Sequence, residues 1–283
     1  MHLPLERFIR IKSGYFSVGL DMSRADRIDE AVFTGTMKRA YLYNSGPAVP
    51  VHIDAVYLSK TLITLYEFNR FIEDTGYCTE AEQEGWGWTW EKGRWCKKDL
   101  LSWRYPFRSD ADAVYSSHAE VMPVLQVSWN DAAAFCSWIS THTGMDVRLP
   151  MEKGWEVFAS LQGVPSAGDY HHMDFANREE GFIPLTTDSF VAELVERFTK
   201  DTSFHPPGVL WEWCGDWFDA YPGGPENREF GKTYRVLRGG SLNSNDLQRS
   251  REYRFRRCPT ARSPFYGFRV AFPASDGSSK EAK

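Results

Sequence analysis

The stretch that decides the fold lies near the C-terminus and begins with Trp211-Glu212-Trp213-Cys214-Gly215-Asp216-Trp217. It continues with Arg235-Val236-Leu237-Arg238-Gly239-Gly240-Ser241 and, further on, Gly267-Phe268-Arg269-Val270. Short apolar segments interrupted by glycine and proline are typical of short strands joined by irregular loops. We therefore expect strands over four segments of this part of the chain: 209–217, 234–238, 253–257 and 267–272.

The first half of the chain adds more short strands. Alternation of apolar and polar residues predicts two strands within 8–20 and another over 50–58. Residues 21–48 are polar and irregular, which predicts a loop. The tryptophan-rich segment 77–125 shows no period, so we expect a long ordered loop there, and such loops often carry function.

Helices are predicted where a capping residue precedes an apolar period. Thr64 and Ser128 are N-cap residues, and Gly144 is a helix-ending glycine. Pro150 is a further start signal, and a weaker apolar period follows later. The expected helices are 65–74, the segment between Ser128 and Gly144, 151–160, and a short one over 189–199.

The composition is that of an ordinary globular protein. The 283 residues are 42% apolar, 25% charged and 15% aromatic, with 11 tryptophans. No internal repeat and no linker rich in proline, glycine and serine divides the chain. We therefore expect one domain over 1–273 and a flexible polar tail over 274–283.

Charge and hydropathy argue against several classes of protein. The formal net charge of −5 implies no whole-molecule attraction to nucleic acid, so no nucleic-acid partner is expected. No apolar run reaches the roughly 18 residues of a membrane span. Residues 1–7 show no signal peptide, which predicts a cytoplasmic protein by default, or an exported one if a signal was removed.

The five cysteines are widely spaced, and no pair has the spacing of a metal site. Their odd number suggests reduced thiols. Cys136 lies on an apolar helical face and Cys214 lies beside Trp213. We interpret both as small buried hydrophobic residues.

Five motifs, in this order along the chain, resemble the formylglycine-generating enzyme (sulfatase-modifying factor) family. Three are the segments quoted above; the others are Val127-Ser128-Trp129-Asn130-Asp131-Ala132 with Phe135-Cys136, and Arg148-Leu149-Pro150-Met151-Glu152-Lys153-Gly154-Trp155-Glu156. The resemblance covers about 8–272. It implies an α+β fold of the C-type-lectin-like kind: loop-rich, with two main helices and small twisted antiparallel sheets.

That fold does not determine function, because similar domains occur in oxidases, sulfoxide synthases, pyoverdine-maturation proteins and the variable proteins of diversity-generating retroelements. In the family's oxidases, one cysteine lies three residues after the Gly-Gly-Ser serine and a second five residues later, and together they bind copper. Here Ser244 and Arg249 occupy those positions, and Cys258 is the one thiol nearby. A hydroxyl and a guanidinium cannot replace thiolate ligands of a soft monovalent ion. We therefore expect no catalytic residues of this kind and no formylglycine-generating activity.

Two other metal sites follow from the resemblance. Sulfoxide synthases take iron ligands from an extra helical domain, which we do not expect here; the cluster of His171, His172 and Asp174 is interpreted as a solvated turn. Calcium is the one candidate cofactor, with Asn177 and Glu212 as its candidate ligands. However, Val209 stands where an oxygen donor is usual, and Glu212 could instead accept hydrogen bonds from backbone or arginine.

The arginines of 239–270 have two interpretations: a basic patch for nucleic acid or an anionic ligand, or pairs with carboxylates that brace loops. The chain is acidic overall and shows no evident platform for base stacking, so we favour pairing. They are Arg249, Arg251, Arg254, Arg256, Arg257, Arg262 and Arg269.

Residues 239–270 also resemble, without gaps, the variable proteins of diversity-generating retroelements, in which the intervening positions face solvent and bind ligand. Those positions here are Ser244, Asp246, Tyr253, Phe255, Arg257, Cys258, Thr260, Ser263, Phe265 and Tyr266. Exposed aromatic residues and arginine among small hydroxyl residues are typical of binding surfaces. The alternative is that the aromatic residues Tyr253, Phe255 and Phe265 point inward as core.

We therefore predict a non-catalytic protein that binds an unknown protein or small-molecule ligand. Its site is expected in the 242–266 loops, joined by the tryptophan-rich segment 86–103. The alternative function is a metal-dependent oxidoreductase of the same superfamily that uses a non-standard site.

Overall fold

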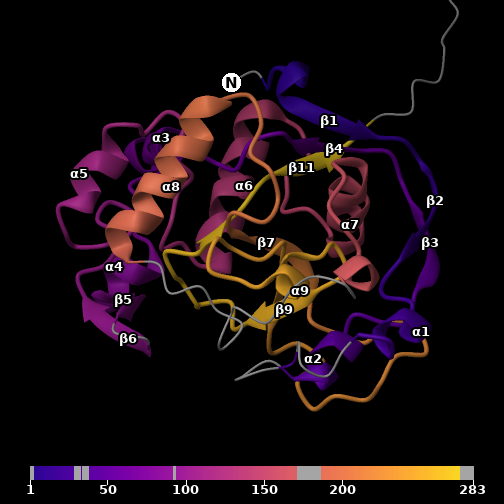
Figure 1. Cartoon of the computed structure of the whole chain (residues 1–283). Coiled ribbons are helices and arrows are strands. Elements are labelled where there is room, and N and C mark those ends of the chain that lie inside the picture. Colours follow the sequence, from indigo (N-terminus) through magenta and orange to yellow (C-terminus); the bar gives the residue numbers. More distant parts are fainter. Residues whose placement is uncertain (1–2, 29–32, 34–37, 92–93, 171–185, 275–283) are drawn as a thin grey trace, which may run out of the picture.

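The computed structural model describes residues 3–28, 33, 38–91, 94–170 and 186–274. In it, strands from the two ends of the chain join the same sheet (Figure 1). In a three-stranded antiparallel sheet, β4 (Val56–Ser59) lies between β1 (Phe8–Ile11) and β11 (Ala271–Pro273). β2 (Gly14–Val18) pairs with β3 (Val49–Ile53) in a separate ribbon. The expected single strand over 50–58 is therefore two strands, β3 and β4, because each half pairs with a different partner.

The C-terminal strands form the second main sheet, in the order β10-β7-β8-β9. Its strands are β7 (Trp211–Trp217), β8 (Arg235–Arg238), β9 (Arg254–Arg257) and β10 (Tyr266–Gly267). β7, β8 and β9 are antiparallel, and the short β10 runs parallel to β7. All four strand predictions for this part of the chain are confirmed, with the last divided between β10 and β11.

The predicted helices are confirmed, each by the signal that predicted it. α3 (Leu65–Thr75) and α6 (Trp129–Thr143) begin with capping boxes and end at left-handed glycines. α7 (Glu152–Leu161) follows Pro150, and α8 (Thr187–Lys200) starts two residues earlier than predicted because Thr186 caps it. The short helices are η1 (Leu5–Arg7), α1 (Met22–Ala25), α2 (Arg39–Tyr43), η3 (Ala167–Tyr170) and α9 (Asp246–Arg249). Because α1 and α2 lie within 21–48, that segment is not loop throughout.

The prediction of a long loop over 77–125 is wrong. The segment contains α4 (Glu80–Glu84), a hairpin of β5 (Trp86–Glu91) and β6 (Arg94–Asp99), and α5 (Ala111–Ser116). Tryptophan recurs at every second position of β5, which is the period of a strand with one apolar face. Glycine and threonine between the tryptophans obscured that period.

The core joins the helices to the C-terminal sheet. Phe68 of α3 meets Trp103 at 5.4 Å between ring centroids, and Phe135 of α6 meets Phe268 at 5.5 Å. All four rings are buried, so aromatic packing contributes strongly here. None of the helices in the described part of the chain combines the length and apolarity needed to cross a membrane.

Candidate ligand-binding site

The loop after β8 holds the two residues that replace the copper-binding thiols. Ser244 is buried, and its Oγ accepts a hydrogen bond from the Ser241 amide at 3.0 Å. Arg249 of α9 donates from Nε to the Ser241 carbonyl at 3.0 Å and from Nη2 to the Leu242 carbonyl at 2.6 Å. Both side chains therefore brace the loop, and neither supplies a soft metal ligand.

The thiols do not compensate for this loss. Cys214 is buried, and burial raises the pKa of its thiol well above the ordinary value, so the thiol stays protonated. Cys258 is exposed, and its Sγ lies 3.6 Å from Thr260 Oγ1. In the described part of the chain no three His, Cys, Asp or Glu side chains gather as a metal site requires. His171, His172, Asp174 and Asn177 lie outside the described residues.

Glu212, the other candidate calcium ligand, forms a buried ion pair. Arg269 donates to its carboxylate from Nε at 2.5 Å and from Nη2 at 2.8 Å, and Trp155 Nε1 donates at 2.7 Å. Glu212 is 1% exposed and Arg269 0%. A guanidinium thus occupies the place where a cation would need free oxygens, and apolar Val209 is buried nearby in the chain. These residues do not fit a calcium site.

The same kind of pairing accounts for most of the arginines in the C-terminal stretch. Arg254 makes a bidentate pair with Glu152 of α7, at 2.8 and 2.7 Å. The neighbouring pairs are Arg238–Glu156, Arg251–Glu252, Arg256–Glu229 and Arg262–Glu84. Arginine suits such pairs because its planar guanidinium can donate two parallel hydrogen bonds to one carboxylate. These arginines therefore hold the C-terminal sheet onto α7 and the surrounding loops.

The ten positions expected to face solvent divide by burial. Ser244, Tyr253, Ser263, Phe265 and Tyr266 are buried, which contradicts the expectation for them. Asp246, Phe255 and Arg257 are half-buried, and Cys258 and Thr260 are exposed. The alternative interpretation, inward packing, holds for Tyr253 and Phe265, whereas β9 turns Phe255 outward because its neighbours Arg254 and Arg256 point inward to their carboxylates.

A surface that we call the tryptophan face lies on the β5–β6 hairpin and consists of Trp86, Trp88, Trp90, Trp95 and Lys97. The register pairs Trp88 with Lys97 and Trp90 with Trp95, so all five side chains share one face. The opposite face packs inward: a Cβ on Gly87 would lie 2.8 Å from Leu101 Cβ. Lys97 Nζ lies 3.8 Å above the Trp86 ring, within cation–π range.

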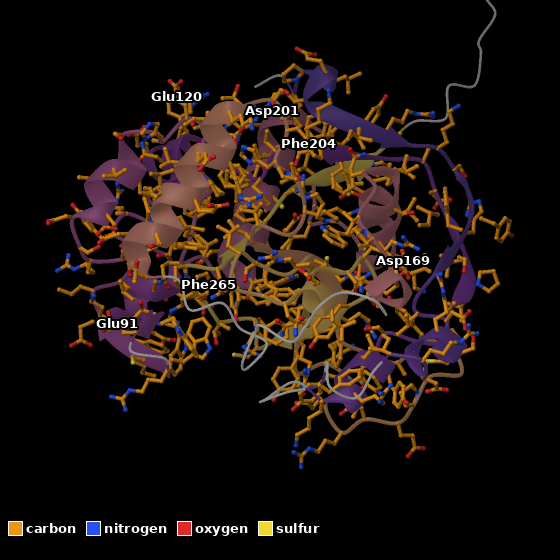
Figure 2. All side chains as sticks on the ribbon, in the orientation of Figure 1. Glu91, Glu120, Asp169, Asp201, Phe204 and Phe265 are labelled. Carbon is orange, nitrogen blue, oxygen red and sulfur yellow. The ribbon has the colours of Figure 1, made fainter. Side chains whose placement is uncertain are left out.

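The tryptophan face adjoins the C-terminal segment. Trp95 meets Phe265 at 5.5 Å between ring centroids, and the Arg262 guanidinium lies 4.0 Å above Trp86. Figure 2 shows Phe265 beside the hairpin whose end carries Glu91. The structure therefore brings together the two segments, 86–103 and 242–266, from which the sequence predicted a binding site.

Beneath the tryptophan face, aromatic packing continues through buried Phe265 and Trp211 to the half-buried Phe255 on the sheet. The Phe265 carbonyl accepts from the Trp211 amide at 2.9 Å, and the Trp211 ring stacks on Phe255 at 4.7 Å. The Arg257 guanidinium lies 4.1 Å above Phe255. The sequence did not identify Lys97 as a binding residue, because its place on the tryptophan face depends on strand register.

The small sheets, the helices around them and the N- and C-terminal strands paired through β4 define a C-type-lectin-like α+β fold. The model of the Sulfatase-modifying factor enzyme 1-like domain matches residues 2–274, and the chain belongs to this family. It is 28% identical to the formylglycine-generating enzyme of Bos taurus, over 95% of this chain and 75% of that protein.

The chain is also similar to one further curated relative and to one solved structure. The chain is 27% identical to the inactive C-alpha-formylglycine-generating enzyme 2 of Mus musculus, over 83% of this chain and 80% of that protein. The solved structure of Treponema denticola variable protein 1 is similar with a TM-score of 0.50 and 16% identity, covering 94% of this chain and 95% of that one. At that identity the similarity concerns the fold.

Proposed function

We propose that this protein binds a ligand without transforming it, through the tryptophan face and the half-buried residues Phe255 and Arg257. The observation that carries the proposal is the contact between Trp95 of the hairpin and buried Phe265, which packs the tryptophan face against the C-terminal segment. The second part of the proposal, that no chemical step takes place, is supported by Ser244 and Arg249, because both side chains form hydrogen bonds within their own loop.

The chemistry of this surface suits an apolar or aromatic patch on a protein or small molecule. Tryptophan offers large contact area at little cost in conformational entropy. Lys97 and Arg257 lie over aromatic rings and still present N–H donors at the edge of the surface. Such a combination provides an apolar contact with a polar margin, which is the usual anatomy of a binding patch.

The non-catalytic half is tested by chemistry. We expect the wild-type protein, loaded with Cu(I), to leave the thiol of a cysteine-containing sulfatase peptide unchanged when the peptide mass is followed with time. Formation of the aldehyde by the wild-type protein would refute this half of the proposal. The double variant S244C/R249C serves as the comparison, because it restores two thiols at the family's positions and should retain more copper against a chelator.

The binding half is tested with a displayed random peptide library selected on the immobilised wild-type protein. We expect the selected peptides to lose at least tenfold in affinity, about 1.4 kcal/mol, on the variant Trp88→Ala/Trp95→Ala. Tyr15→Ala is the matched control, because Tyr15 is an exposed ring (80%) on β2, away from the surface. Peptides that bind the tryptophan variant as tightly as the wild type would contradict the proposed site.

A finer form of the proposal is that the binding positions are diversified, as the likeness of 239–270 to variable proteins suggests. The test is genomic. A reverse transcriptase gene and a near-identical template repeat beside the 3′ end of the coding sequence are expected, and their absence would remove this finer form while leaving the binding proposal intact.

A further inference from the structure

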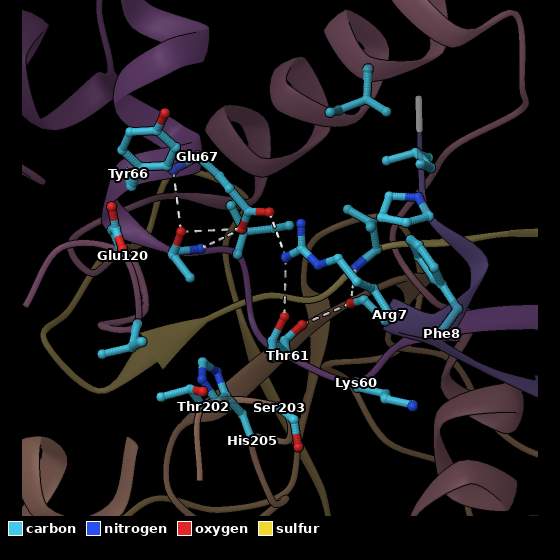
Figure 3. A pocket seen from close by; sticks show the side chains of 18 of the residues that line it. Arg7, Phe8, Lys60, Thr61, Tyr66, Glu67, Glu120, Thr202, Ser203 and His205 are labelled. Carbon is cyan, nitrogen blue, oxygen red and sulfur yellow. Dashed lines mark hydrogen bonds and ion pairs between the residues drawn. The ribbon is translucent and has the colours of Figure 1, made fainter. Parts of the chain in front are cut away.

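A cavity of about 610 Å³ lies between the N-terminal segment, the start of α3, α6 and the loop 202–205 (Figure 3). Its lining shares no residue with the tryptophan face, so it is a separate feature of the molecule. The volume falls within the range of roughly 300–1,000 Å³ typical of small-molecule sites.

One wall of the cavity is apolar. It is formed by the side chains of Ile63, Val121, Phe135, Trp138, Ile139 and Val270. Three of the six, Phe135, Trp138 and Ile139, come from α6, and Phe135 is 1% exposed. An occupant therefore needs an apolar body to cover this wall.

The base of the cavity is held together by backbone hydrogen bonds between distant segments. The Lys60 amide donates to the Arg7 carbonyl at 2.8 Å, and the His205 amide donates to the Lys60 carbonyl at 3.0 Å. The Leu62 amide donates to His205 Nδ1 at 3.1 Å. The cavity is thus preformed on a fixed base, which reduces the entropy lost on binding.

His205 forms an uncharged part of that base. Because Nδ1 accepts from Leu62, the ring proton lies on Nε2, which is itself buried. Burial, and secondarily the Arg269 charge, lower the pKa of His205 to about 3, so the ring stays neutral at physiological pH. His205 therefore brings no charge to the cavity.

The charged lining residues favour an anion at one end. Glu67 is occupied, because it accepts from Arg7 Nη2 at 2.7 Å and from the Thr64 amide at 2.9 Å. Within the described residues Lys60 has no ion pair, and it is half-buried. Glu6, Arg70 and Glu120 lie on the exposed rim.

Figure 3 shows how these charges are distributed. Lys60 and Arg7 lie on one side of the cavity, and Glu120 lies on the other side next to Tyr66. Among the described residues, the least exposed lining charge without an ion pair is therefore the ammonium of Lys60, because Arg7 on its side is paired with Glu67. An anionic group beside Lys60 would be attracted there, whereas a cationic group would be repelled.

We propose that this cavity binds a small amphipathic monocarboxylate. Its carboxylate lies beside Lys60, and its apolar body lies against Val121, Phe135 and Trp138. The site does not depend on the tryptophan face, so either proposal can fail without the other.

Octanoate is the probe, with octanol and octylamine as comparisons of equal chain length, each titrated into the full chain by calorimetry. We expect octanoate to saturate one site and to bind at least tenfold more tightly than octanol or octylamine. Lys60→Gln should weaken octanoate about tenfold, the effect of losing one charge-assisted hydrogen bond, and should leave octanol unchanged. Lys232→Gln, at an exposed lysine elsewhere, is the matched control and should change nothing.

A second variant locates the site. Val121→Trp fills the cavity and should abolish octanoate binding, while Trp88→Ala in the tryptophan face should leave it at the wild-type level. Octylamine binding as tightly as octanoate, no saturable binding of octanoate, or unchanged octanoate affinity in Lys60→Gln would each overturn the proposal. Lys60→Gln decides the question even if Val121→Trp fails to fold.

Discussion

The most informative single change is Glu212→Gln, because Glu212 was both a candidate calcium ligand and a candidate structural acceptor. The amide keeps the shape of the carboxylate but not its charge. Arg269 would then remain buried beside a neutral group, with its other donors still directed to the carbonyls of Ser59 at 2.7 Å and His205 at 3.1 Å. The guanidinium cannot release its proton to escape this, because its pKa is too high.

The magnitude follows from burial. Removing one partner of a fully buried ion pair costs about 3–5 kcal/mol, whereas the whole folding free energy of a typical domain is about 5–15 kcal/mol. With a urea dependence of about 3 kcal/mol per molar, the unfolding midpoint should fall by roughly 1–1.7 M. Glu193→Gln is the matched control: the Arg197–Glu193 pair on α8 is exposed, and its loss should cost only about 0.3–0.5 kcal/mol.

The assay is urea unfolding followed by tryptophan fluorescence, with and without calcium. We expect calcium to leave the wild-type midpoint unchanged. The double variant Glu212→Gln/Arg269→Met should lose less than the sum of the two single variants, because the second change removes the unpaired charge. A loss below 1 kcal/mol for Glu212→Gln, or a calcium-dependent wild-type midpoint that this variant abolishes, would refute the assignment of Glu212 to a structural ion pair.

Three further changes test other parts of the structure. Gly87→Ala should lower the free energy of unfolding, measured in urea, by about 1–3 kcal/mol, because the added Cβ would lie 2.8 Å from Leu101 Cβ. Gly240→Ala should cost about 1–3 kcal/mol by the same assay, because φ is +72° and the Cβ would meet the Gln248 carbonyl at 2.9 Å. Burial raises the pKa of Asp216 from 3.8 to about 6. The folded protein therefore holds this proton more tightly than the unfolded chain, and the resulting stabilisation is full below pH 3.8 and lost as pH rises to about 6. Unfolding midpoints measured from pH 4 to 8 should show the wild type losing stability relative to Asp216→Asn up to about pH 6, and the two proteins changing in parallel above it.

Local signals predicted the helices because capping is a local interaction. Thr64 and Ser128 each accept from the amide three residues later, so the residues that decide the helix start lie within one turn of it. Gly76 and Gly144 end their helices for an equally local reason, since both adopt the left-handed conformation. Nothing beyond a short window of sequence was needed for these elements.

The hairpin that carries the tryptophan face was missed for a different reason. Its alternation is present in the sequence, but the inward positions of β5 are glycine and threonine, and its outward positions are tryptophan. The usual rule places large apolar residues inside, and here it gives the opposite assignment. Strand β6 is mostly polar, so its own pattern does not predict that it pairs with β5. Gln126, whose amide nitrogen donates to the Trp88 carbonyl at 2.8 Å, ties β5 to the rest of the molecule.

The same inversion on β9 explains why the binding surface could only be predicted in part. Arg254 and Arg256 point inward because carboxylates at Glu152 and Glu229, far away in sequence, complete their ion pairs. A strand has only two faces, so inward arginines force Phe255 and Arg257 to the other side. There Phe255 stacks on buried Trp211 and stays half-buried. Thus the ion pairs of the inner face and the outward position of Phe255 have one cause. A variant such as Glu152→Gln that weakens the inner face should therefore also loosen Phe255, although the two side chains lie on opposite faces of the sheet.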